Sequence, residues 1–418
     1  MYTISQHTAT ANKALFETGA AYTSFMLKDF AAAKNYLASA KQMSPNANVA
    51  DQWALTNLLV TINEKDKIDA AFEEQILPSV QWLMQKAKAE KIIKTADSWS
   101  DISPWKQFYR NLFNNIMAPL YHKQGDLNKE ALAYGAADNI YPNNYSMFYG
   151  GGIEFLRNKL SVVDVEKLYS LLSGKQNKFE QFVINNNQIK LSTVVDFAGT
   201  AYLREANYTK AIEWLKKSPA ASAVNKNPFI DLLYDREGKL PEDAKIKTTK
   251  LAFAQEMLRL QSLAKTDKAN AAKHLYKMAL GFYNTTYYGH TWELVQYNRS
   301  GSDGYYLPDN ATAFEKEYYG CYAAHNSFKA AMDASNDKNF KARCLFMMGK
   351  CSQKTVHQPQ YNEFPNNWEA YDKAQANYLP TFKNNTYFPQ FVKEYKGTKF
   401  YEEAFNSCSY LRDFVGKK

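Results

Sequence analysis

The sequence predicts an all-α fold, an array of helical hairpins in which each unit packs on its neighbours. Apolar residues recur at helical spacing along most of the 418 residues, and one short pattern recurs several times. No segment alternates convincingly between apolar and polar residues as a strand would. The content of 45% hydrophobic and 22% charged residues suits an ordered chain, and only 17 Gly and 13 Pro favour helices over many tight turns. The length exceeds what one compact core organises, which favours several domains or an extended array.

The recurring pattern is clearest from Val195 onward. It places a small residue and then an aromatic residue at fixed spacing on one helix, followed by a polar turn and a second helix. Its members are Val195, Ala198, Gly199, Tyr202, Asn207, Tyr208, Ala211 and Leu215. The spacing follows W-x2-L-G-x2-Y…A-x3-F, in which the small residue lets the two helices of a hairpin approach closely.

Further copies share a small residue at the same register. The five small residues are Gly19, Ala118, Gly199, Ala279 and Gly349. The pairs Asp29-Phe30, Gly125-Asp126 and Asn207-Tyr208 lie where the chain must turn between helices. Degenerate hairpins are expected between these copies, at Asp51–Lys88, Ile153–Asn186, Phe229–Leu263 and Phe314–Ala334.

These motifs resemble the tetratricopeptide repeat, and the resemblance covers about half of the chain. It implies a right-handed superhelix of TPR-like hairpins, an α-solenoid whose concave face is lined mostly by first helices and binds peptides or other proteins. The chain also looks similar to TPR proteins of the Bacteroidota cell envelope in its richness in Lys, Asn and aromatic residues. The resemblance therefore implies a binding protein.

The pattern divides the chain into three segments. Residues 1–288 are expected to form TPR-like repeats, residues 289–312 an aromatic insertion loop, and residues 313–418 C-terminal TPR-like hairpins with a capping helix. A second irregular stretch spans Lys354–Asn367. Long loops in compact proteins are usually functional or disordered, and aromatic residues argue against disorder.

The aromatic loop supplies the candidate partner-binding residues, because Trp, Tyr and Arg concentrate binding energy in interfaces. These residues are Trp292, Tyr297, Arg299, Tyr305 and Tyr306. An equally weighted alternative is that Trp292 and Tyr297 anchor the loop against the repeats. The two alternatives differ in whether the side chains face a partner or the chain itself.

No catalytic, cofactor-binding or metal-binding residue is predicted. The sequence has no P-loop, no G-x-S-x-G, no H-E-x-x-H and no C-x-x-C. Cys321 and His325 with Cys344 or Cys351 could supply metal ligands, but buried thiols packing without a metal are the preferred interpretation. We therefore expect no enzyme and no cofactor.

The net charge of +9 is spread along the chain without a basic stripe, so nucleic acid is not an expected partner. No apolar run is long enough to span a membrane. No signal peptide is visible at the start, and the helical pattern begins so early that the chain is expected to be cut from a longer protein. The compartment is left open, with a periplasmic or outer-membrane-associated location favoured over the cytoplasm.

The predicted function is a non-catalytic protein–protein interaction scaffold or adaptor, part of a larger and possibly membrane-associated assembly. Its partners would be other proteins or peptides. The alternative is a glycan- or small-ligand-binding helical protein resembling SusD-like lipoproteins, with Trp292, Tyr305 and Tyr306 as stacking surfaces.

Overall fold

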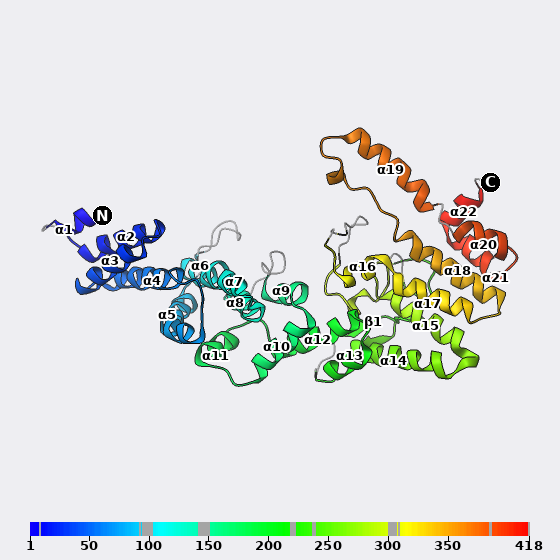
Figure 1. Cartoon of the computed structure of the whole chain (residues 1–418), viewed down its shortest axis with the longest axis horizontal. Coiled ribbons are helices and arrows are strands. Elements are labelled where there is room, and N and C mark those ends of the chain that lie inside the picture. The colour runs from blue at the N-terminus through cyan, green and yellow to red at the C-terminus, as the bar shows by residue number, and fades with distance from the viewer. Residues whose placement is uncertain are drawn as a thin grey trace. The chain divides into compact units, whose positions relative to one another are not determined.

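A computed structural model of the chain confirms the all-α prediction (Figure 1). The structure describes residues 1–7, 10–91, 93, 103–140, 151–217, 223–235, 240–299, 307, 310–383 and 387–416. The chain divides into two compact units, Met1–Val194 and Val195–Lys418. The division into segments 1–288, 289–312 and 313–418 stays a prediction.

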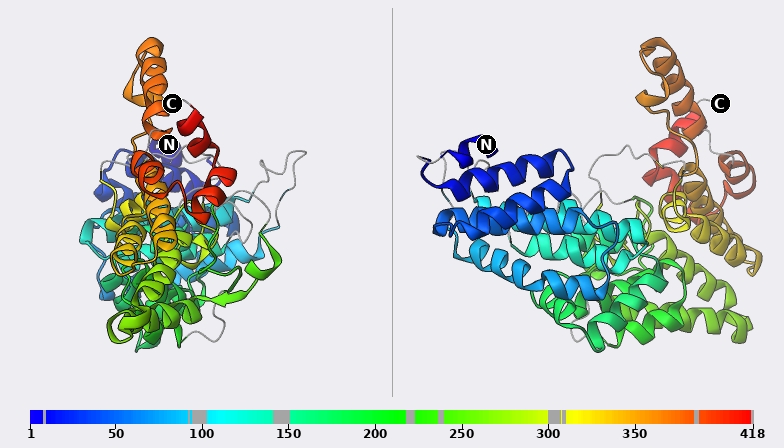
Figure 2. Two further views of the ribbon diagram at one scale, coloured as in Figure 1. Left: turned by 90° about the vertical axis from the view of Figure 1, so that its right-hand side faces the viewer. Right: turned by 60° about the vertical axis from the view of Figure 1, so that its left-hand side comes forward.

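The first unit consists of short and medium helices. Its elements are α1 (Tyr2–Gln6), α2 (Lys13–Met26), α3 (Phe30–Gln42), α4 (Ala47–Asn63), α5 (Ala70–Ala89), α6 (Pro104–Asn111), the π-helical turn η2 (Leu112–Met117), α7 (Ala118–Gln124), α8 (Leu127–Asn139), α9 (Gly152–Lys159), α10 (Val162–Ser173) and α11 (Lys178–Asn185). Figure 2 shows α2 to α5, in blue, stacked one beside the next, in agreement with their contacts. Ala21, Ala33, Leu37 and Val60 form the core of the first hairpins.

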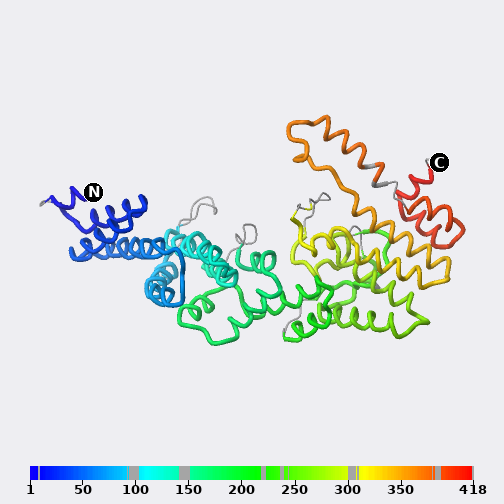
Figure 3. The backbone as a smooth tube through the Cα atoms, in the orientation of Figure 1, coloured from blue at the N-terminus to red at the C-terminus, as the bar shows by residue number. Residues whose placement is uncertain are grey.

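The second unit is also helical, apart from one very small sheet. Its elements are α12 (Leu191–Arg204), α13 (Tyr208–Leu215), β1 (Ala223–Asn225), η4 (Glu242–Ala244), β2 (Lys247–Thr249), α14 (Lys250–Thr266), η5 (Lys268–Asn270), α15 (Ala271–Asn284), η6 (Trp292–Leu294), α16 (Ala313–Gly320), α17 (Tyr322–Asp333), α18 (Lys338–Gln353), η7 (Tyr361–Glu363), α19 (Trp368–Lys383), α20 (Tyr387–Tyr395), α21 (Lys399–Ser407) and α22 (Ser409–Gly416). In Figure 3 the backbone runs back and forth through α14, α15, α17 and α18, and each of these helices packs on the next. This order makes α15 and α18 alternate members of one antiparallel array.

Three hairpins close with the same turn, which confirms the expected turn positions. Asp29, Asp126 and Asn207 each cap the second helix by accepting a hydrogen bond from the backbone N–H three residues on, at 2.9, 3.0 and 3.2 Å. Each also donates its own N–H to a carbonyl five residues back, and the residue before it is left-handed, with φ of 61°, 75° and 54°. This is the hydrogen-bond pattern of a Schellman turn, which gives the last carbonyls of the first helix a donor while the next helix begins.

The small-residue register has different contacts in different copies. A Cβ added at Gly199 would lie 2.5 Å from Cγ of Leu215 on α13, so this glycine does permit close approach of two helices. At Gly19 the nearest atom is the sulfur of Met1 instead. The aromatic residue three positions later also varies, since Tyr202 is buried whereas Tyr22 is 48% exposed.

Two expectations need correction in the region before α14. The sequence suggested no strand, yet β1 and β2 pair antiparallel with Val224 opposite Thr248. The hairpin expected over Phe229–Leu263 is also wrong in its first half, because residues 227–235 contain no helix. Pro228 and Pro241 interrupt the helical pattern there, since proline removes a backbone donor and disfavours helix at the residue before it.

Candidate functional site

An extended segment, Asn227–Asp235, lies against α15 and α18 of the second unit. Beyond a turn at its start, the segment has no regular secondary structure, and side chains of the two helices bind it. We call the helix residues that bind it the α15/α18 surface. They are Tyr276, Tyr283, Asn284, Arg343, Lys350 and Lys354, the last of which directly follows α18.

Asp235 is the most heavily bonded side chain of the segment. Its carboxylate lies 2.9 Å from Nζ of Lys350 and 2.6 Å from Nζ of Lys354, and both lysine side chains are 10% exposed. Tyr283 donates its hydroxyl to the same carboxylate at 2.6 Å. Burial alone would raise the pKa of Asp235, but the two lysine charges outweigh it and hold that pKa far below its ordinary value. Asp235 is therefore ionised at any physiological pH.

Asp231 also binds a tyrosine of α15 and a cation of α18, each seven residues before those that bind Asp235. Its carboxylate accepts the hydroxyl of Tyr276 at 2.9 Å and pairs with the guanidinium of Arg343. The partners of Asp235, Tyr283 and Lys350, follow those of Asp231 by seven residues on each helix. Seven helical residues rise about 10 Å and four extended residues span about 13 Å, so the segment runs alongside both helices between its two aspartates.

The helices also bind the main chain of the segment. The amide of Asn284 donates to the carbonyls of Pro228 and Ile230, at 3.0 and 2.9 Å. Lys350 donates to the carbonyl of Leu233 at 3.0 Å. Side chains thus replace the strand or helix partners that these carbonyls would otherwise need.

Apolar contacts complete the binding of the segment. The ring of Phe229 stacks on Phe253 of α14 with a centroid distance of 5.8 Å, and Nζ of Lys277 lies 4.9 Å from the centroid of the Phe229 ring. A Cβ at Gly281 would come within 2.9 Å of Phe229, so this glycine makes room for the ring. Leu233 packs against the buried core of the unit.

The chemistry of this surface favours binding rather than proton transfer. Burial and Asp235 raise the pKa of Tyr283, and burial and Asp231 raise the pKa of Tyr276, so both phenols remain donors. Burial would lower the pKa of Lys354, but Asp235 raises it above the ordinary value. The groups are therefore fixed donors and cations, the types that bind carboxylates.

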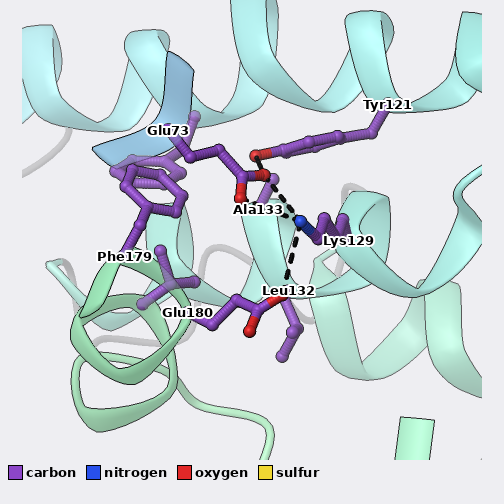
Figure 4. Close-up of a pocket in the computed structure, with 9 residues that line it drawn as sticks. Glu73, Tyr121, Lys129, Leu132, Ala133, Phe179 and Glu180 are labelled. Carbon is purple, nitrogen blue, oxygen red and sulfur yellow. Dashed lines mark hydrogen bonds and ion pairs between the residues drawn. The ribbon is translucent and has the colours of Figure 1, made fainter. Parts of the chain in front are cut away.

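A second buried charge cluster lies in the first unit, around a small pocket (Figure 4). Lys129 on α8 contacts both carboxylate oxygens of Glu73 on α5 at 2.8 Å and lies 3.4 Å from Glu180 on α11. Tyr121 on α7 donates to Glu73 at 2.8 Å. Apolar side chains, among them Phe179, line the rest of the pocket. Each polar group has a partner on another helix, so the cluster joins four helices.

The described part of the predicted aromatic loop is packed against the second unit. Tyr297 donates its hydroxyl to Asp196 at 2.6 Å and lies 3.0 Å from the hydroxyl of Thr200. Arg299 donates to the carbonyls of Tyr287 and Gly289 at 3.1 and 3.2 Å.

The face of Trp292 carries the guanidinium of Arg299, at 5.0 Å from the ring centroid. These contacts give Trp292, Tyr297 and Arg299 internal partners, as the anchoring alternative requires. Tyr305 and Tyr306 lie outside the described residues. Binding of a partner by the loop stays a prediction.

Of the possible metal ligands, Cys321 and Cys351 lie within hydrogen-bond distance of each other, but they do not form a metal site with His325 or Cys344. His325 lies 2.8 Å from the hydroxyl of Tyr387, and Cys321, Cys344 and Cys351 are buried free thiols. Burial raises the pKa of Cys344 to about 12, so it is a poor nucleophile at neutral pH. Within the residues that the structure describes, no group of three His, Cys, Asp or Glu side chains could hold a metal ion.

In the same described ranges, no helix combines the length and apolar content needed to cross a membrane. Comparison with known proteins adds no family: the chain matches no protein-family model, no curated protein and no solved structure. The site therefore rests on geometry alone.

Proposed function

We propose that the protein is a non-catalytic protein–protein interaction scaffold built from TPR-like helical hairpins arranged as a right-handed superhelix. The observation that carries this proposal is the binding of Asn227–Asp235 by the α15/α18 surface. Amide and lysine side chains contact the main chain of the segment, while cations and phenols bind its carboxylates. A helical surface with these contacts is suited to an extended peptide.

The repeated hairpin turn supports the same proposal. Asp29, Asp126 and Asn207 close three hairpins with one geometry, as expected of a chain built from similar units. Membership of the TPR family and a place in a periplasmic or outer-membrane-associated assembly of a Bacteroidota cell envelope are parts of the proposal. They rest on the sequence resemblance.

A peptide selection on the immobilised full chain tests this function. We expect the selection to enrich peptides, and we expect these peptides to lose binding when Lys350 and Lys354 are both changed to Gln. The matched control is Lys329→Gln on α17, whose ion pair with Asp333 is exposed on the surface. Failure to enrich any peptide would argue against the proposed function, and so would enriched peptides whose binding is unchanged by the Lys350 and Lys354 substitutions.

A further inference from the structure

The contacts of Asn227–Asp235 point to more than a structural connection. We propose that this segment is an internal ligand of the α15/α18 surface, and that it is displaced by a partner protein carrying an extended acidic segment of the same chemistry. That chemistry is an aromatic residue, an acidic residue two positions later and a second acidic residue four positions beyond it. The inference rests on the proposed function, because it names the ligand and the regulation of that same surface.

The helices pack on one another without help from the segment. α14 packs on α15, α15 on α17, and α17 on α18. The last three of these helices share a core that includes Ala279, Phe328 and Leu345. Asn227–Asp235 contributes one partly buried apolar side chain, Leu233, to this core. Removing the segment from the surface therefore exposes mainly polar groups, together with the place on α14 and α15 where the Phe229 ring stacks on Phe253.

The charge of the surface requires an acidic ligand. Without Asp231 and Asp235, the cations Arg343, Lys350 and Lys354 lose the carboxylates that they share with the segment. Among the described residues, only Arg343 keeps a second acidic neighbour, Glu403 at 2.8 Å. Largely buried cations without counter-charges are unfavourable, so the vacant surface attracts another pair of carboxylates.

The internal ligand fits the surface imperfectly, which leaves room for a better one. Asp231 Oδ1 is buried and has no hydrogen-bond partner among the described residues, although Oδ2 accepts two hydrogen bonds, from Tyr276 and Arg343. An unsatisfied buried acceptor weakens binding. Most of the segment is only partly buried, and Tyr234 is 42% exposed. A partner that satisfies the second oxygen would compete effectively.

A direct test uses a fluorescent peptide with the sequence of residues 227–235, Asn-Pro-Phe-Ile-Asp-Leu-Leu-Tyr-Asp, and the full-length chain. Binding is measured by fluorescence polarisation to the unchanged chain and to a variant with Asp231→Asn and Asp235→Asn. The variant weakens the internal ligand but leaves the surface intact. We expect it to bind the peptide at least tenfold more tightly, since occupancy of a site by a competitor lowers apparent affinity in proportion.

Two controls define the specificity. A peptide with both aspartates changed to Asn should bind the Asp-to-Asn chain at least tenfold more weakly than the unchanged peptide does. The unchanged peptide should also lose at least tenfold in affinity when the Asp-to-Asn chain carries Lys354→Gln as well. Circular dichroism confirms that each variant is folded. Asp235→Asn alone replaces the double variant if the double variant does not fold.

The outcomes separate this inference from the proposed function. Equal binding to the unchanged chain and to the variant overturns the internal-ligand inference, while the surface still binds peptides as proposed. No binding to either overturns the inference too, and the independent peptide selection then decides the proposed function. If light scattering shows that the Asp-to-Asn variant loses a dimer formed by the unchanged chain, the ligand is the segment of a second copy, which overturns the choice of partner.

Discussion

The two units have buried charge clusters of similar chemistry that serve different roles. In the first unit, Glu73, Lys129, Tyr121 and Glu180 all belong to helices, so their bonds join α5, α7, α8 and α11. In the second unit, the helices supply the cations and phenols, but the carboxylate of Asp235 comes from an extended segment.

The difference shows how to distinguish a structural cluster from a binding surface. Glu73 is fully buried and bonded only within the helical array, so losing its partner should disrupt that array. Asp235 lies outside the helix–helix packing, so losing it should release a segment and leave the helices folded. The same set of residue types thus predicts global destabilisation in one unit and local release in the other.

The largest expected effect is that of Lys129→Met. It leaves the carboxylate of Glu73 buried without its cation, which should destabilise the first unit by about 3–5 kcal/mol. Urea unfolding measures the loss, and hydrogen exchange assigns it to a unit. The matched control is Lys123→Met, whose pair with Asp66 is exposed and should change stability by less than about 1 kcal/mol. Equal losses in the two variants would mean that the Glu73 cluster does not hold the unit together.

Gly199→Leu tests whether hairpin packing holds the second unit. Because even a Cβ would lie 2.5 Å from Cγ of Leu215, we expect overpacking to cost about 1–3 kcal/mol. The thermal melting temperature should fall accordingly. Gly397→Leu is the control, since no atom lies within 4 Å of an added Cβ there. An unchanged melting temperature for Gly199→Leu would show that α12 and α13 can separate without loss.

Asp235→Asn should have a smaller and local effect. The folded pKa of Asp235 is depressed, so its contribution is present above the ordinary carboxyl pKa of 3.8 and is lost as pH falls towards the folded value. We therefore expect the wild-type segment to stay protected from protease at pH 5 and to loosen only well below pH 4. The variant should be cleaved within the segment at pH 7, with helical content retained. Cleavage that spreads into α15 or α18 would contradict local release.

His290→Gln should produce the smallest change, a change in the pH dependence of stability. Nε2 of His290 lies 3.3 Å from the carbonyl of Tyr234, and burial lowers the pKa of His290 below 6.5. Its contribution is thus complete above pH 6.5 and declines below it, by at most about 1.4 kcal/mol per pH unit for one proton. Urea unfolding at pH 7 and pH 5 should show a shallower slope in the variant. His357→Gln, at an exposed histidine, is the control for the substitution itself.

Local features of the fold could be predicted from the sequence. Asp126 and Asn207 identified helix starts because capping needs only a polar side chain and a nearby N–H. Gly199 identified a close helix contact because its partner, Leu215, lies on the next helix of the same hairpin.

The binding surface could not be predicted in this way. Asp231 and Asp235 are four residues apart among apolar residues, as on an amphipathic helix, which explains the mistaken hairpin over Phe229–Leu263. The neighbouring Pro228 and Pro241 are the sequence features that argue against a helix here. The partners Arg343 and Lys354 lie 112 and 119 residues away, so no local pattern connects them to the segment. Only the fold brings these charges together.

The most direct test replaces residues 227–235 of the full chain with a Gly/Ser linker of equal length. The free peptide is then added, and the melting temperature is measured. We expect the replaced chain to keep its helical signal and the peptide to raise its melting temperature, because a ligand of the folded state stabilises it by mass action. The peptide carrying Asn at both aspartate positions should raise it much less. If the second unit of the replaced chain unfolds, or if the replaced chain is folded but unaffected by the peptide, residues 227–235 are not an internal ligand of the α15/α18 surface.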